Sequence, residues 1–156
     1  MQNPEILPAS TADYPELIAV WEAAVRATHD FLSEADILQY RQLILEQYFD
    51  TVRLYCIKDN NRIIAFMGIN GQFLQMLFIH PDWRGKGIGK ILVLHAISAF
   101  GIYEVDVNEQ NTQAVGFYYH LGFELAERFH QDAAGKPYPI LAMVLKTESK
   151  SRNWFI

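Results

Sequence analysis

Glycines and basic residues are concentrated in one short segment of the chain. From Arg84 to Lys90 the sequence reads RGKGIGK, and its glycines can adopt backbone conformations in which N–H groups face a close ligand. Apolar residues then recur at helical spacing, namely Ile88, Ile91, Leu92, Ala96 and Ala99. The segment therefore opens a predicted helix, whose N-terminal N–H groups and dipole favour an anion. A phosphate, and most simply a pyrophosphate, is the predicted ligand.

The spacing within this segment excludes two common nucleotide motifs. A P-loop needs Ser or Thr after its Gly-Lys pair to hold magnesium, but Lys90 is followed by Ile91. The dinucleotide pattern G-x-G-x-x-G fails as well, because no third glycine stands at the required distance. The pattern that does fit is R-x-x-G-x-G, formed by Arg84, Gly87 and Gly89 directly after an apolar strand and a proline turn.

A second pattern, N-x-x-A-x-x-F-Y-x-x-x-G-F, begins at Asn111. It predicts a helix over 111–121 that a glycine terminates. The core face of this helix is expected to hold Ala114, Phe117 and Leu121. Asn111 and Tyr118 lie seven residues apart, so both side chains are expected along one line on a neighbouring face.

Together the two patterns resemble those of the GCN5-related N-acetyltransferases (GNAT), and the resemblance covers roughly residues 5–146. Within that superfamily the segments RATHDFL, VNEQN and GKPYP most resemble bacterial enzymes of the YjaB/YiaC type. The resemblance implies an α/β (α+β) GNAT fold with a mixed, mostly antiparallel sheet of six or seven strands and about four flanking helices. It also implies one parallel strand–helix–strand crossover at the cofactor site.

The resemblance further implies which residues bind acetyl-CoA, the co-substrate. The strand backbone at Leu77, Phe78 and Ile79 would pair with the pantetheine arm, and one of its N–H groups would polarise the thioester carbonyl. Asn111 would bond the pantetheine or acyl region, and Tyr118 would protonate the leaving thiolate. The pyrophosphate would be held by Arg84, Gly85, Lys86, Gly87, Ile88, Gly89 and Lys90.

The chemistry of acetyl transfer supports these roles independently. Attack of an amine on a thioester creates an oxyanion, which needs a preorganised donor, and the departing thiolate must gain a proton. The ordinary pKa of tyrosine, ~10, keeps Tyr118 protonated at neutral pH and therefore able to donate. The expected route is direct transfer to a primary amine without a covalent enzyme intermediate, because the placement of Cys56 in a predicted buried strand disfavours it as an acetyl carrier.

The general base is the open question in this sequence. Many relatives carry a glutamate on the strand before the glycine loop, but this chain has Gln75, whose amide cannot accept the proton. Asp106, on the predicted strand before Asn111, is one substitute. His29 is another, because it interrupts an N-terminal helical pattern and its ordinary pKa of ~6.5 suits proton removal. A water relay is the third.

Composition bounds the class of protein. The 156 residues carry a formal charge of −5, with 51% hydrophobic and 20% charged residues, which is typical of a soluble globular protein. The sequence predicts one domain over 1–146 and a polar tail over 147–156. No membrane span, secretory signal or metal-ligand spacing is recognisable, and the single cysteine, Cys56, lies in an apolar run. We therefore expect a cytoplasmic monomer or homodimer without a metal, nucleic-acid or membrane partner.

The other elements follow from apolar spacing and turn residues. Strands are predicted over 4–8 at a sheet edge, 52–58, 62–69, 72–79, 103–107, 123–130 and 138–145. Helices are predicted after Ser10, from Ser33 to about Phe49, and over 88–100.

Two other functions remain open. A non-catalytic acyl-CoA-binding sensor or regulatory module is consistent with Gln75, and acylation of charged tRNA is a third possibility that the charge of −5 disfavours. The amine itself could be a protein lysine, a protein N-terminus or a small molecule. Acceptor specificity is expected in residues 26–36 and 130–139.

Overall fold

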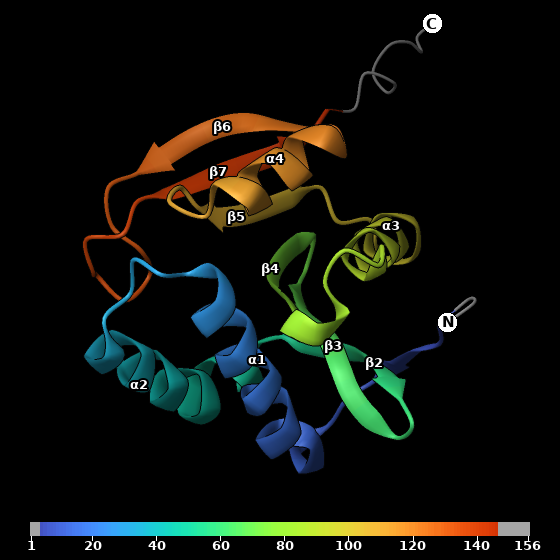
Figure 1. Cartoon of the computed structure of the whole chain (residues 1–156). Helices are drawn as coiled ribbons and strands as arrows, with labels where there is room; N and C mark the ends of the chain where they lie inside the picture. The colour runs from blue at the N-terminus through green and yellow to red at the C-terminus, as the bar shows by residue number, and fades with distance from the viewer. Residues whose placement is uncertain (1–3, 147–156) are drawn as a thin grey trace, which may run out of the picture. The chain divides into compact units, whose positions relative to one another are not determined.

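The structure is a computed structural model, and it describes residues 4–146. It divides into two compact units, Met1–Ile102 and Tyr103–Ile156. The first unit contains β1 (Ile6–Pro8), α1 (Tyr14–Thr28), α2 (Glu34–Leu43), β2 (Arg53–Asp59), β3 (Arg62–Asn70), β4 (Phe73–Ile79) and α3 (Ile88–Phe100), and the second contains β5 (Glu104–Asn108), α4 (Thr112–His120), β6 (Phe123–Phe129) and β7 (Ile140–Leu145) (Figure 1).

The four strands of the first unit pair in chain order and are antiparallel throughout. β1 pairs only with β2 within this unit, so it lies at the sheet edge where its two prolines predicted it. The tight turn between β2 and β3 is made by Asn60 and Asn61, both at positive φ (51° and 64°). Adjacent Asn residues tolerate this left-handed conformation, which matches the twist of a hairpin.

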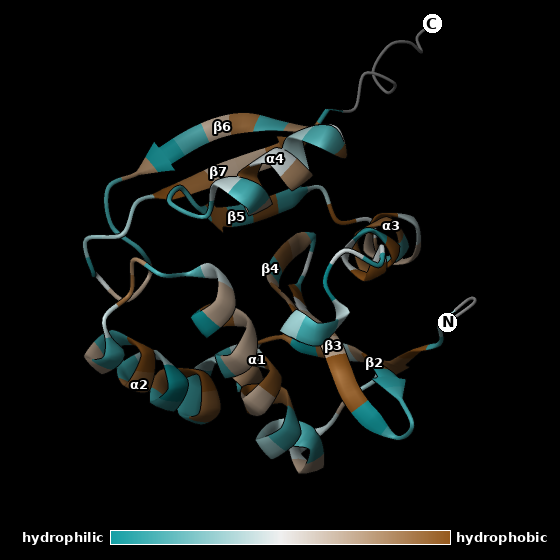
Figure 2. Cartoon of the chain, viewed as in Figure 1, coloured by the Kyte–Doolittle hydropathy of each residue, from teal (hydrophilic) through white to brown (hydrophobic). Residues whose placement is uncertain are grey.

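β3 is the central element of the first unit. Its side chains are buried from Ile63 to Ile69, which requires cover on both faces of the sheet. Phe66 belongs to a cluster with Leu17 and Trp21 of α1, and α3 also contacts β3. Alternate residues of a strand face opposite sides of the sheet. The continuous apolar run of β3 (Figure 2) is therefore explained by helices that cover both faces of the strand.

The helices of the first unit agree with the predictions except in two places. The helix predicted after Ser10 is present as α1, with an apolar buried face. α2 ends at Leu43 and continues as a π-helix (Ile44–Tyr48) and a 3₁₀ turn (Phe49–Thr51) rather than as one helix to Phe49. In α3 the buried residues are Ile88, Leu92, Val93 and Ala96. The predicted core positions Ile91 and Ala99 are exposed, and the buried face of the helix is turned toward Val93, away from Ile91.

In the second unit, β7 pairs with both β5 and β6, and both pairings are antiparallel. The predicted hairpin of β6 and β7 is confirmed, and a β-bulge interrupts its register between Leu125 and Glu127. α4 contacts β5 and β6. The prediction that residues 1–146 form a single domain stays a prediction, and the tail over 147–156 lies outside the described residues.

Candidate active site

The segment after β4 forms a turn and then a glycine-rich loop, in the predicted order. Pro81–Trp83 form a 3₁₀ turn, and the imidazole Nδ1 of His80 accepts a hydrogen bond from the backbone N–H of Asp82 (3.1 Å). Arg84 is extended, and α3 begins at Ile88. The loop over 84–87 is therefore anchored at one end by a capped turn and at the other by a long apolar helix.

Two glycines of this loop adopt the left-handed conformation that disfavours other residues. Gly85 has φ +75° and Gly87, the N-cap of α3, has φ +81°, and a Cβ at either position would meet no atom within 4 Å. No side chain caps the helix at Gly87. The first N–H groups of α3 therefore have neither an intrahelical partner nor a side-chain cap, which is the arrangement that binds a phosphate group.

The basic residues of the loop add positive charge beside this helix end. The Nζ atom of Lys86 lies 5.9 Å from the centre of the Trp83 ring, in a cation–π contact. Within residues 4–146, no acidic side chain forms an ion pair with Lys86 or Lys90. Both ammonium groups can therefore contribute to an anion site, and the loop fits the pyrophosphate predicted from the sequence.

β4 contains an irregularity at the position where a glutamate base would be expected. Gly68 of β3 pairs with Met76 and Ile69 pairs with Leu74, so Gln75 is the extra residue of a β-bulge. A bulge redirects the side chain at that position, and Gln75 is exposed. Its amide can orient a ligand through hydrogen bonds but cannot accept a proton as a base.

The strand residues after the bulge have the expected regular backbone. Leu77, Phe78 and Ile79 are half-buried and pair with Met67, Phe66 and Ala65 of β3 respectively. These three successive residues pair without any irregularity in register, so they form a regular strand segment. Such a strand can pair with an extended ligand chain by main-chain hydrogen bonds.

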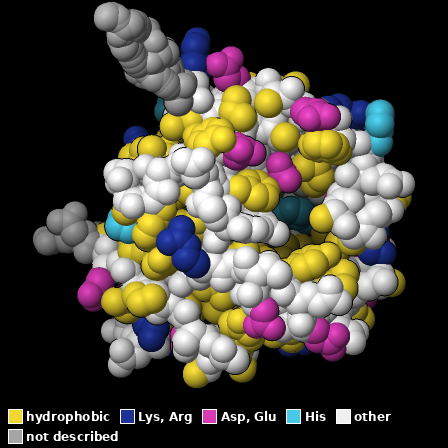
Figure 3. All heavy atoms as spheres, turned by 180° about the vertical axis from the view of Figure 1, so that it is seen from behind, with side chains coloured by type: hydrophobic (Ala, Val, Ile, Leu, Met, Phe, Trp, Pro, Cys, Tyr) yellow, Lys and Arg dark blue, Asp and Glu magenta, His cyan; other side chains and the backbone are white. Residues whose placement is uncertain are grey.

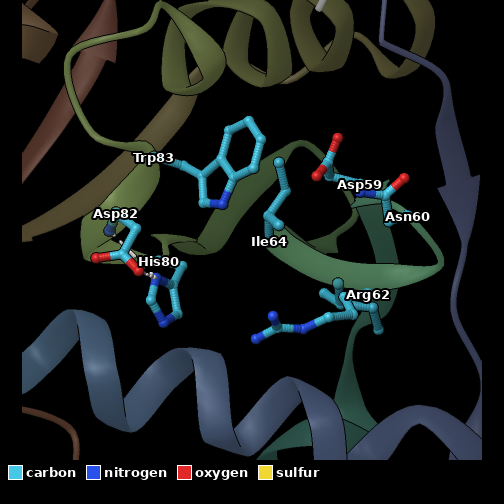
Figure 4. A pocket seen from close by; sticks show the side chains of 8 residues that line it. Asp59, Asn60, Arg62, Ile64, His80, Asp82 and Trp83 are labelled. Carbon is cyan, nitrogen blue, oxygen red and sulfur yellow. Dashed lines mark hydrogen bonds and ion pairs between the residues drawn. The ribbon is translucent and has the colours of Figure 1, made fainter.

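A pocket of about 110 Å³ lies beside the 3₁₀ turn (Figure 4). The β2–β3 turn, β3 and the His80–Trp83 segment supply its walls, with Asp59, Asn60, Arg62, Ile63, Ile64, His80, Asp82 and Trp83 as lining residues. None of the residues predicted to bind the co-substrate lines this pocket. It is a separate polar hollow whose rim includes the aromatic partner of Lys86.

His29 is the C-cap residue of α1, and one nitrogen of its ring contacts the preceding residue. Its backbone N–H donates to the Val25 carbonyl (2.7 Å), and its Nδ1 lies 2.7 Å from the hydroxyl oxygen of Thr28. The imidazole also tilts against the Phe31 ring at 5.2 Å. Burial lowers the pKa of His29 to about 4, against a smaller opposing effect of Asp30. The imidazole is therefore neutral at pH 7.

Asp106 and Asn111 belong to the second unit. Asp106 lies on the exposed face of β5, opposite the buried Val105 and Val107. Partial desolvation of its carboxyl group, together with the nearby Glu104, raises its pKa. Asn111 is the N-cap of α4, where its Oδ1 accepts from the Ala114 N–H (3.3 Å). This role is compatible with binding a ligand through the Nδ2 group.

Tyr118 is placed differently from the prediction. It was expected beside the core face of its helix, but it is the buried residue of α4, only 6% exposed, and its ring packs edge-on against Phe123 and Phe117. Phe117 and Leu121 are only half-buried. Within residues 4–146 the Tyr118 hydroxyl makes no hydrogen bond, and burial raises its pKa. The phenol therefore stays protonated and keeps its hydrogen for an external acceptor.

The segments expected to set acceptor specificity are rigidly organised. The Arg26 guanidinium forms two hydrogen bonds to Glu34 (2.7 and 2.8 Å) and one to Glu22 (3.0 Å), which also pairs with Arg41. In the β6–β7 loop, Asp132 Oδ1 accepts from the N–H groups of residues 134 and 136. Neither these links nor the Thr28–His29 contact was predicted, although Glu22 and Arg26 stand at the i,i+4 spacing of a helical ion pair.

The sequence of this chain is similar to those of known acetyltransferases. Residues 50–125 match the family model described as "Acetyltransferase (GNAT) domain". The chain is 43% identical over 129 residues (83% of this chain and 89% of the relative) to the peptidyl-lysine N-acetyltransferase YjaB of Salmonella typhimurium. It is 22% identical to the peptidyl-lysine N-acetyltransferase YiaC of Escherichia coli, over 86% of this chain and 92% of the relative.

Solved structures show the same fold. The solution structure of apo YjaB from Escherichia coli superposes with a TM-score of 0.81 at 38% identity, covering 91% of this chain and 97% of that one. A Thermoplasma acidophilum N-acetyltransferase in complex with coenzyme A superposes with a TM-score of 0.70 at 24% identity, covering 88% and 96%. The predicted fold class and the predicted YjaB/YiaC-type resemblance are confirmed. Among residues 4–146, no helix is long and apolar enough to span a bilayer.

Proposed function

Because the chain belongs to the GNAT acetyltransferase family and is an N-acetyltransferase, we propose that it transfers the acetyl group of acetyl-CoA directly to the side-chain amine of a protein lysine. The observation that carries the choice of donor is the uncapped N-terminus of α3, with its two left-handed glycines and the ammonium groups of Lys86 and Lys90. A diphosphate satisfies these N–H groups and cations together.

Different residues of the chain have different roles in the reaction. The backbone over 77–79 pairs with the pantetheine arm and polarises the thioester carbonyl, which stabilises the oxyanion of the adduct. Asn111 orients the arm with its amide. Tyr118 donates its hydroxyl proton to the departing thiolate, a role that the absence of a hydrogen-bond partner within residues 4–146 supports. Its raised pKa keeps the phenol protonated at neutral pH but also makes it a weaker acid than an ordinary tyrosine.

The general base is His29 or Asp106. His29 is neutral at pH 7 because burial lowers its pKa, so its lone pair is available. Asp106 has a carboxyl group whose pKa is raised by burial and by Glu104, which makes it a stronger base than an ordinary aspartate. Gln75 is excluded because an amide has no useful basicity.

The choice of acceptor rests on the relatives. The similar proteins from Salmonella typhimurium and Escherichia coli are named peptidyl-lysine N-acetyltransferases, and one of them covers 83% of this chain at 43% identity. A lysine side chain carries its amine on a long unbranched stem, so it can reach a reaction centre with little burial of the protein that bears it.

The experiment combines the purified full-length chain and acetyl-CoA with three acceptors of equal concentration. These are a lysine peptide with an acetylated N-terminus, the same peptide with arginine for lysine and a free N-terminus, and a small primary amine. We expect thiol release and a single added acetyl group on the lysine peptide, at least ten times faster than on the other two. Turnover confined to the free N-terminus or to the small amine would overturn the proposed acceptor but not the proposed donor.

A non-catalytic acyl-CoA sensor predicts another outcome of the same assay, namely CoA binding without thiol release on any acceptor. Acylation of charged tRNA requires a basic surface. The net charge is −5, and on the face shown in Figure 3 the Lys and Arg side chains are dispersed rather than gathered in one patch. These observations favour a protein acceptor over a nucleic acid.

A further inference from the structure

The hydroxyl group of Thr28 contacts two groups at the C-terminal end of α1. Its oxygen lies 2.8 Å from the carbonyl oxygen of Ala24 and 2.7 Å from Nδ1 of His29. A carbonyl oxygen can only accept, so the single hydroxyl hydrogen of Thr28 is donated to Ala24. The hydrogen between Thr28 and His29 must therefore belong to Nδ1, which donates to a lone pair of the hydroxyl oxygen.

This assignment fixes the tautomer of the histidine. A neutral imidazole carries one N–H, so hydrogen on Nδ1 leaves a lone pair on Nε2. The imidazole is neutral at pH 7 because burial lowers its pKa to about 4. Nε2 makes no hydrogen bond within residues 4–146, so its lone pair is available to a ligand.

The backbone around the imidazole is held on both sides. The His29 N–H donates to Val25 (2.7 Å), and the His29 carbonyl accepts from the N–H of Leu32 (3.1 Å). The ring itself rests against Phe31 at 5.2 Å. α1, which ends at this histidine, contacts β4, the strand proposed above to pair with the pantetheine arm. His29 therefore stands at the end of a helix that packs on the proposed donor-binding strand.

We propose that Thr28 is a positioning residue that holds His29 in the Nδ1–H tautomer, so that Nε2 accepts the proton of the attacking amine. This inference rests on the acetyltransferase function proposed above. As the bond from nitrogen to the acetyl carbon forms and the carbon–sulfur bond breaks, one amine proton passes to Nε2 and the thiolate takes the hydroxyl proton of Tyr118. His29 and Tyr118 then return to their starting forms by proton exchange with water.

A weak base is adequate for this step. A free alkylammonium is a poor acid, but its nitrogen becomes far more acidic once it is bonded to the tetrahedral carbon of the adduct. The base must then be unprotonated and correctly aimed, and the lowered pKa of His29 makes it a weaker base than an ordinary histidine. Burial keeps the imidazole unprotonated, and the contact with Thr28 fixes which nitrogen carries the lone pair.

The first measurement is nitrogen-15 NMR of the imidazole rings in the full-length protein without ligand, which needs no turnover. We expect a pyrrole-type signal for Nδ1 and a pyridine-type signal for Nε2 of His29 at pH 7. In Thr28→Val the Nδ1 hydrogen loses its acceptor, and both nitrogens are expected to move toward averaged shifts. A wild-type spectrum with hydrogen on Nε2 would overturn the inference, whether or not the protein acetylates lysine.

The second measurement is steady-state acetylation of the lysine peptide. Thr28→Val is expected to lower kcat by at least tenfold with less than threefold change in the KM for acetyl-CoA, and Thr28→Ser is expected to recover most of the loss. His29→Gln should lower kcat at least as much as Thr28→Val. Circular dichroism establishes that each variant is folded.

Thr51→Val is the matched control, because the Thr51 hydroxyl also donates to a backbone carbonyl, that of Tyr48 (2.7 Å), but contacts no histidine. It should keep the wild-type kcat. A normal kcat in folded Thr28→Val, or loss of kcat in Asp106→Asn with normal turnover in His29→Gln, would refute the assignment. If the wild-type chain acetylates no amine, the proposed function fails, and the NMR result still decides the tautomer separately.

Discussion

The buried phenol of Tyr118 is the residue whose surroundings argue most directly for chemistry. Buried polar groups nearly always have a hydrogen-bond partner, and an unpaired one costs about 1–3 kcal/mol. The Tyr118 hydroxyl has none within residues 4–146, although only 6% of the side chain is exposed. An unpaired buried hydroxyl lowers stability. Its presence is best explained by a hydrogen-bond acceptor that the substrate brings to the site.

Tyr118→Phe separates the effect of this hydroxyl on stability from its effect on catalysis. Removing an unpaired hydroxyl should leave the melting temperature unchanged or slightly higher, because the ring contacts with Phe117 and Phe123 remain. Loss of a general acid should lower kcat by about 10²-fold with little effect on acetyl-CoA binding. Tyr119→Phe, a change at the exposed neighbouring residue, is the matched control and should behave as wild type. Equal kcat values for the two variants would remove Tyr118 from the mechanism.

The lowered pKa of His29 predicts how stability depends on pH. Its folded pKa is about 4 against ~6.5 in the unfolded chain, so between these values the unfolded state binds a proton that the native state does not. Stability contributed by neutral His29 is therefore present above pH 6.5 and is lost as the pH falls toward 4. His29→Gln cannot titrate, and we expect its melting temperature to fall less than that of the wild type between pH 7 and 5.

Melting curves at four pH values, with the exposed-residue variant His120→Gln for comparison, measure this difference. Parallel losses of stability in His29→Gln and in the wild type would show that the imidazole is not desolvated in the native state.

The residue scale also shows the limit of spacing arguments. Tyr118 was predicted beside the core face because Ala114, Phe117 and Leu121 formed a stripe, yet they are only half-buried. α4 is short and contacts two strands, so its orientation is decided by the large ring that packs against Phe123 rather than by the number of apolar side chains. Periodicity identifies a helix, but tertiary packing selects which of its residues is buried.

At the scale of elements, the loop before α3 was predictable and the end of α2 was not. Glycines followed by an apolar helical stripe have few local alternatives, so Gly85 and Gly87 take positive φ as expected. The residues after Leu43 include no glycine or proline that would predict the end of the α-helix. The change from α-helix to π-helix accompanies the packing of Ile44 and Phe49 in the core. The bulge at Gln75 likewise leaves no mark in the sequence.

Gly87→Ala tests the loop as an element. The alanine side chain would be strained at φ +81°, and the unfavourable left-handed conformation costs roughly 1–2 kcal/mol. If the loop relaxes, the N–H groups of α3 lose their alignment, so we expect at least tenfold weaker CoA binding by calorimetry. Gly71→Ala introduces similar strain at φ +61° in the β3–β4 turn and is the matched control, with lower stability but unchanged CoA binding. Unchanged binding in Gly87→Ala would exclude this helix end as the pyrophosphate site.

At the scale of the whole molecule, the sequence predicted the family and the class of reaction because two motifs with separate physical reasons occur in one chain. One forms a helix N-terminus suited to a diphosphate, and the other supplies the capping amide of Asn111 and the phenol of Tyr118. The acceptor could not be predicted, because residues 26–36 and 130–139, where we expect its specificity, follow no pattern that identifies a substrate. Contacts such as those of Arg26 with Glu22 and Glu34 become visible only in the folded chain.

Direct transfer also has a consequence for the whole molecule. Cys56 is fully buried and burial raises the pKa of its thiol, so it is not available as an acetyl carrier. The most direct test follows the intact mass of the protein and the amounts of CoA and acetyl-lysine peptide during a single turnover. We predict one CoA released for each acetyl-lysine formed, with the protein mass unchanged throughout. An acetylated form of the chain that precedes the product, or CoA release without acetyl-lysine, would contradict the account.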